Sequence, residues 1–164
     1  MTRRSETVVA IILCSLLASA CGGGEKQHTD TTAIGAPPSS TPAATPGAAP
    51  AIVGKTWDVK MLGDATGYRF DPPMLTIKAG DGVRWTVVSG PPHNVTFWPD
   101  SIPPRAEATL RASMTQTIAP LTGPLLINPS LTYTVGFVGA PPGTYHYYCT
   151  PHLAVGMKGV IVVQ

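Results

Sequence analysis

The chain has 164 residues and a formal net charge of +2, with 12% charged and 43% hydrophobic residues. This length fits one domain of ordinary size, and so small a charge gives no reason to expect a nucleic-acid partner or a basic membrane-binding patch. Loss of a leader that carries Arg3, Arg4 and Glu6 lowers the net charge to +1, so we expect partners that are not chosen by a strong overall field. We also expect the protein to be a monomer.

Residues 1–20 have the pattern of a signal peptide. Two arginines precede an apolar core at 8–17, which is too short to span a bilayer comfortably. Residues 16–21 resemble the lipobox of bacterial lipoproteins, in which the cysteine, here Cys21, becomes the first residue and is acylated. The match has Ala18 where that family prefers Leu, and residues 18–20 also fit ordinary signal peptidase. Both routes predict export to the periplasm or cell envelope, and we favour the lipid-anchored form.

The segment 21–51 is expected to be a flexible tether. It is rich in Gly, Ala, Pro, Thr and Ser and has no periodic apolar pattern. Such a segment cannot bury enough apolar surface to offset the entropy lost on ordering. His28 lies here and is expected to be solvated.

From residue 52 to 164 the pattern changes to short β-rich runs separated by Gly and Pro, which is typical of an all-β sandwich. The expected strands are 56–62, 74–78, 82–88, 94–98, 131–138, 143–148 and 159–163. A short helical turn is possible at 106–114, but the rest of 99–130 has no clear assignment. Six large side chains are expected in the core: Trp57, Met61, Met74, Trp85, Trp98 and Met114.

The cysteine pattern points to chemistry near the C-terminus. If the leader is cleaved before Cys21, Cys149 is the only thiol of the folded domain and cannot form an internal disulfide. His152 and Met157 follow it at i+3 and i+8, and His93 lies upstream beside an expected strand. Two His, one Cys and a weak axial Met are the ligands of a blue-copper electron-transfer site.

The alternation of the strand that leads to Cys149 orients this site. Tyr145, Tyr147 and Cys149 share one face, so His146 and Tyr148 point the other way. Turns at 150–151 and 155–156 can then return His152 and Met157 to the same end of the sandwich.

Two polar residues are expected to support the ligands. The Asn94 side chain follows His93 directly, and its amide can bond across to Thr150, which follows Cys149. This contact would hold the two ligand segments together.

These motifs resemble the cupredoxins, and most closely their plastocyanin and pseudoazurin branch. The resemblance rests on Cys149-x2-His152-x4-Met157, on residues 92–95 and on the strand 143–148. It implies a Greek-key β-sandwich with one type 1 copper, cycling between Cu(I) and Cu(II), held by His93, Cys149, His152 and Met157.

The resemblance also implies a function, which is to carry single electrons between a donor protein and an acceptor protein. The exposed edge of His152 would be the electron port, ringed by Pro91, Leu153 and Ala154, and Tyr148 offers a second route. Plant members dock through an acidic patch, and this chain has no such cluster of carboxylates.

The residues around the predicted ligands argue against other functions. A zinc hydrolase or cysteine hydrolase needs an acid near the site, but the two ligand segments contain no Asp or Glu. A copper oxidase or nitrite reductase needs ligands for further coppers, which four histidines do not supply, so we expect a carrier and not an enzyme. Copper delivery or storage remains the alternative, although the Met-rich or His-rich clusters typical of it are missing.

Overall fold

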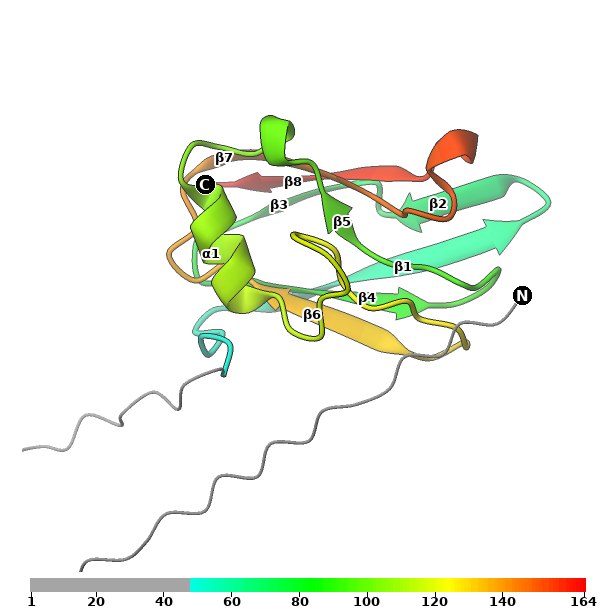
Figure 1. The fold of residues 1–164 in the computed structure, drawn as a ribbon, viewed down its shortest axis with the longest axis horizontal. Helices are drawn as coiled ribbons and strands as arrows, with labels where there is room; N and C mark the ends of the chain where they lie inside the picture. Colours follow the sequence, from blue (N-terminus) through cyan, green and yellow to red (C-terminus); the bar gives the residue numbers. More distant parts are fainter. Residues whose placement is uncertain (1–47) are drawn as a thin grey trace, which may run out of the picture. The chain divides into compact units, whose positions relative to one another are not determined.

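The computed structural model describes residues 48–164, so the predicted signal peptide 1–20, Cys21 and nearly all of the tether 21–51 lie outside the described residues. The described part is mostly β and consists of two four-stranded sheets that form two layers (Figure 1). The expected sandwich is therefore confirmed, with one short helix added to it.

The first sheet has the order β2-β1-β4-β6 and is mixed. Its central strands β1 (Thr56–Asp64) and β4 (Gly82–Val87) run parallel, whereas β2 (Gly67–Asp71) and β6 (Thr132–Gly136) pair antiparallel at the two edges.

The second sheet has the order β3-β8-β7-β5 and is also mixed. Strand β3 (Met74–Ile77) runs parallel to β8 (Lys158–Val163), and β7 (Gly143–Tyr148) pairs antiparallel with both β8 and β5 (Thr96–Phe97).

Alternation along the strands builds the core between the sheets. In β7 the side chains of Tyr145 and Tyr147 are fully buried, while His146 is exposed, as the period of two predicts. Trp85 from β4 meets the ring of Tyr147 edge-on at 5.4 Å between centroids, a geometry that aromatic pairs favour. Burial of each such side chain stabilises the fold by about 1.5–3 kcal/mol.

All seven expected strands exist, with ends shifted by no more than two residues, but β2 was not expected. Its sequence, Gly-Tyr-Arg-Phe-Asp, offers only two apolar side chains. The prediction of Met74 as a core residue is wrong, because its side chain is 62% exposed on the edge strand β3. Trp57 and Trp98 are half-buried, and the other three expected core residues are buried.

The stretch 99–130 contains a 3-10 turn, η1 (Pro99–Ser101), and one helix, α1 (Ala106–Ser113). The helix confirms the short helical turn expected at 106–114, whereas the rest of the stretch had no assignment. Ala106, Leu110 and Ser113 are its buried residues, which is the spacing of one helical face. On the exposed face Glu107 and Arg111 form an i,i+4 ion pair of 2.7 Å. No helix among residues 48–164 has the length and apolar character needed to cross a membrane.

Candidate metal centre

Three side chains with metal-binding atoms meet at one end of the sandwich. The ligand atoms of His93, Cys149 and His152 all lie within 4.8 Å of one another. The Cys149 Sγ atom is 3.7 Å from Nδ1 of His93 and 3.4 Å from Nδ1 of His152. Both imidazoles therefore present the same type of nitrogen to the sulfur.

The loop 149–157 is closed by its own backbone. The amide of His152 donates to the carbonyl of Cys149 at 3.1 Å, and the amide of Cys149 donates to the carbonyl of Met157 at 3.1 Å. A second 3-10 turn, η2 (Leu153–Val155), ends at Gly156, whose φ of +88° suits a residue without a Cβ. In Figure 1, η2 lies at the opposite end of the sandwich from the C-terminus.

Met157 is the fourth expected ligand, and the loop carries it into the interior. Its side chain is 0% exposed, and its amide donates to the carbonyl of His152 at 3.1 Å. The residue thus lies at the base of the loop, between the imidazole segment and strand β8.

His93 comes from the segment between β4 and β5 and is fully buried. Its backbone pairs with Leu126, and its Nε2 atom lies 2.9 Å from the carbonyl oxygen of Ser89. Because a carbonyl only accepts, Nε2 must carry the proton, which leaves the lone pair on Nδ1 facing Cys149. This is the tautomer that a metal ligand requires.

Asn94 connects the two ligand segments. Its Oδ1 atom accepts from the amide of Thr150 at 2.7 Å, and its Nδ2 donates to the Thr150 hydroxyl at 3.2 Å. The Thr96 hydroxyl lies 2.9 Å from that of Thr150 and extends the same network. The hydrogen bond expected between Asn94 and Thr150 is therefore present.

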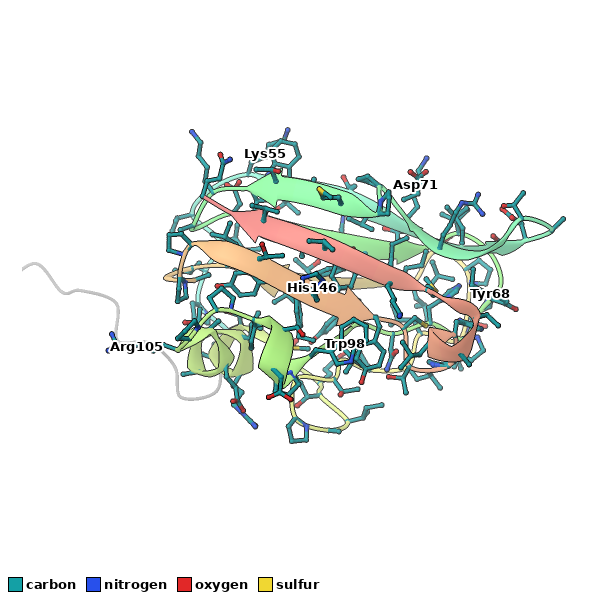
Figure 2. All side chains as sticks on the ribbon, turned by 90° about the horizontal axis from the view of Figure 1, so that it is seen from above. Lys55, Tyr68, Asp71, Trp98, Arg105 and His146 are labelled. Atoms are coloured by element: carbon teal, nitrogen blue, oxygen red, sulfur yellow. The ribbon has the colours of Figure 1, made fainter. Side chains whose placement is uncertain are left out.

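His152 is the least buried of the four residues, and an aromatic ring covers it. Tyr68 of β2 stacks on His152 with 3.7 Å between ring centroids and 14° between planes. Figure 2 shows Tyr68 beside the η2 turn. The same tyrosine meets His93 edge-on at 6.1 Å.

Burial sets the protonation of the metal-free site. It raises the pKa of the Cys149 thiol, an effect opposed by hydrogen bonds from the backbone of Asn94 and His152. It lowers the pKa of His93, and the pKa of His152 is lowered by burial and by the charge of His93. At neutral pH the site therefore holds two neutral imidazoles and one thiol, of which only the thiol must lose a proton to bind a metal.

The donor set fits copper better than a hydrolytic metal. One thiolate and two imidazoles suit both Cu(I) and Cu(II). The loop 149–157 contains no Asp or Glu, so it offers no carboxylate that could act as the base of a hydrolytic metal site. His146 is exposed on the outer face of β7, away from this cluster (Figure 2). His28 and Cys21 lie outside the described residues.

Two residues that contact the imidazoles, Ser89 and Tyr68, were not predicted from the sequence. Ser89 acts through its backbone carbonyl, which no side-chain pattern reveals. Tyr68 belongs to β2, and the alternation Tyr68-Arg69-Phe70 is too short a signal to predict that strand.

Comparison with known proteins finds one matching family and several similar chains. Residues 57–164 match the model of the family described as copper binding proteins, plastocyanin/azurin family. The chain is 43% identical over 110 residues to plastocyanin of Synechococcus sp. (strain JA-2-3B'a(2-13)), which covers 67% of this chain and 74% of that protein. It is 37% identical over 116 residues to plastocyanin of Nostoc punctiforme, which covers 70% and 78%.

The chain is also similar to a solved structure in fold and in sequence. The oxidized and reduced structures of a mutant plastocyanin of fern align with a TM-score of 0.52 and 32% sequence identity, over 66% of this chain and all of that chain.

Proposed function

Because this chain belongs to the plastocyanin/azurin family of copper-binding proteins, we propose that it is a type 1 copper electron-transfer protein with His93, Cys149, His152 and Met157 as its ligands. Copper bound here would supply one-electron chemistry by cycling between Cu(I) and Cu(II). The protein is then a carrier that passes electrons between partner proteins, and not an enzyme with a substrate of its own.

The observation that carries this proposal is the convergence of Cys149 Sγ with two Nδ1 atoms within 4.8 Å. The fold helps to set the orientation of these atoms, since the Ser89 carbonyl fixes the His93 tautomer and the backbone closes the loop. Ligands held by the fold in this way are expected to move little between oxidation states, which favours fast electron transfer.

The exposed edge of His152 supports it as the place where electrons leave. His152 and Leu153 are half-buried, and Val155 is 62% exposed beside them. An apolar rim of this kind sheds water readily against a partner surface. Loss of this contact surface would slow transfer to a partner without changing the spectrum of the site.

Protein-film voltammetry of the copper-loaded protein tests the function. We expect a reversible one-electron wave in the wild type and in His146→Ala, where the exposed histidine near the ligand strand is removed. Cys149→Ser must abolish that wave. A Cys149→Ser protein that still gives the reversible one-electron wave would contradict the proposal.

Copper delivery or storage is the alternative, and burial argues against it. His93, Cys149 and Met157 are each 0% exposed, so three of the four proposed ligands shield a bound metal from an acceptor. Slow loss of copper to a chelator is the expected result, and rapid loss would favour the alternative.

For the N-terminal region we propose export and a lipid anchor at Cys21, with residues 21–51 as the tether. This rests on the arginine pair, the short apolar core and the cysteine that follows it. Metabolic labelling with a fatty acid tests it: Cys21→Ser must lose the label and move from the membrane fraction to the soluble fraction. An unlabelled wild type would favour cleavage by ordinary signal peptidase.

A further inference from the structure

The β1–β2 hairpin reaches over the metal centre and contacts both imidazoles. Tyr68 stacks on His152 at 3.7 Å and 14°, and its edge faces His93 at 6.1 Å and 65°. The two imidazole rings themselves lie 4.9 Å apart. One tyrosine thus packs against both nitrogen ligands.

A glycine makes room for the Tyr68 ring. Gly63 of β1 lies directly opposite Tyr68 in the antiparallel register. A Cβ at Gly63 would lie 2.5 Å from Cε1 of Tyr68 and 3.0 Å from the Cα atom of Gly90. Only a residue without a side chain lets the tyrosine ring and the loop before His93 approach β1 together.

The same glycine secures the loop that orients His93. The Gly63 amide donates to the Ser89 hydroxyl at 3.2 Å, and the carbonyl of Ser89 accepts from His93. His93 is therefore held through a hydrogen bond from this part of the fold. Within residues 48–164, His152 has no such bond at its Nε2 atom, and the ring that stacks on it is that of Tyr68.

We propose that Tyr68 is a positioning residue that holds the His152 ring in its ligand orientation and thereby slows the loss of copper from the site. His152 is the natural point of release, because it is half-buried whereas the other three ligands are fully buried. Rotation of its ring toward solvent requires the stacked tyrosine to move first. The aromatic ring of Tyr68 holds His152 by stacking, and its hydroxyl is not needed for this.

This inference rests on the proposed copper site, and the test separates the two. Tyr68→Leu, Tyr68→Phe and a control, Tyr148→Leu, are loaded with copper and reduced, and the transfer of Cu(I) to excess bicinchoninate is timed. The blue absorption of each oxidised variant shows whether the copper site itself exists. Tyr148 is the matched control because it is also half-buried but packs against Trp98, with 4.4 Å between ring centroids and 34° between planes.

We expect Tyr68→Leu to release copper about tenfold faster, the lower end of the effect of removing a residue that supports a metal ligand. The release rates of Tyr68→Phe and Tyr148→Leu should stay within about twofold of the wild-type rate. Tyr68→Phe keeps an aromatic ring on His152, and Tyr148→Leu leaves Tyr68 itself in place. Equal release from wild type and Tyr68→Leu, or release from Tyr68→Phe as fast as from Tyr68→Leu, overturns the proposal.

A measurement on the wild type covers the case in which Tyr68→Leu does not fold. In the diamagnetic Cu(I) protein, nuclear Overhauser contacts between the Tyr68 and His152 rings should be strong. Their absence overturns the proposal, whereas absence of any blue band in the wild type would instead contradict the proposed function.

Discussion

Asn94 and Thr150 lie 56 positions apart in the sequence and are joined by two hydrogen bonds, of 2.7 and 3.2 Å. Each residue directly follows a ligand, since Asn94 follows His93 and Thr150 follows Cys149. The pair therefore ties the imidazole segment to the thiol segment independently of the metal ligands themselves.

Removal of this link should loosen the site. Asn94→Ala is expected to lower the free energy of unfolding by about 1–3 kcal/mol, because it deletes two hydrogen bonds and leaves the Thr150 amide without its partner. It should also broaden the visible band of the oxidised protein, since the ligands sample more geometries. Urea unfolding and an absorption spectrum measure both effects. The control Thr150→Ser keeps the hydroxyl and should stay close to wild type; an Asn94→Ala protein of unchanged stability would contradict the role of the pair.

Copper binding should release one proton from Cys149. Its pKa is raised by burial while those of His93 and His152 are lowered, so near pH 7.5 both imidazoles are neutral and only the thiol has to lose a proton. Binding of Cu(I) then displaces about one proton, and affinity rises about tenfold per pH unit in this range. Calorimetry in buffers of different ionisation enthalpy counts the proton, with Cys149→Ser as the control that releases none. A pH-independent affinity would mean that the thiol is not a ligand.

Two neighbouring core tyrosines should respond differently to loss of the hydroxyl. Tyr145 donates to the carbonyl of Pro141 at 2.7 Å, whereas the buried Tyr147 hydroxyl has no partner among the described residues. Tyr145→Phe is expected to cost about 1 kcal/mol, and Tyr147→Phe should be neutral or stabilising. Chemical denaturation of both variants, each still carrying its ring, tests the difference. A larger loss at Tyr147 than at Tyr145 would contradict the hydrogen-bond assignment.

Asp81 should make the fold sensitive to acid. Its carboxylate accepts from the amides of Lys78 and Lys55 at 3.0 and 2.8 Å and from the indole of Trp57 at 2.9 Å. These bonds lower its pKa in the folded state, led by that from Lys78. The stability they contribute is full above the unfolded pKa, about 3.9, and is lost as the pH falls through the lower folded value.

The variant Asp81→Asn isolates this effect. It should cost about 1–3 kcal/mol at pH 7 and show a weaker fall in stability below about pH 4, because the group that titrates there is gone. Asp100→Asn, at an exposed position in η1, serves as the control and should behave as wild type. An identical acid profile for Asp81→Asn and wild type would refute the assignment.

The parts of the fold that follow from alternation could be predicted from the sequence. The strand before Cys149 keeps its inward and outward faces as expected, because period-two burial depends only on neighbouring residues. Strand β2 was missed because its five residues gain their place from pairing with β1 and not from their own β propensity. Apart from the helical turn at 106–114, the segment 99–130 could not be assigned, since two of its isolated bridges join residues distant in sequence, such as His93 and Leu126.

The residues of the candidate site likewise fall into those that could be predicted from the sequence and those that could not. Its ligands could be named because thiolate, imidazole and thioether at a fixed spacing form a chemical pattern in one short loop. Ser89 and Tyr68 could not, since one acts through its backbone and the other across the sheet. Long-range placement of this kind is a property of the folded chain and leaves little local trace.

The central claim is that Cys149 and the two imidazoles bind copper as a type 1 site, and a visible absorption spectrum tests it most directly. The protein loaded with Cu(II) is measured before and after addition of ascorbate and again after re-oxidation. We predict an intense blue band from thiolate to copper that bleaches and returns. A pale or absent band in the folded protein would mean that Cys149 is not a copper ligand, and would contradict the account.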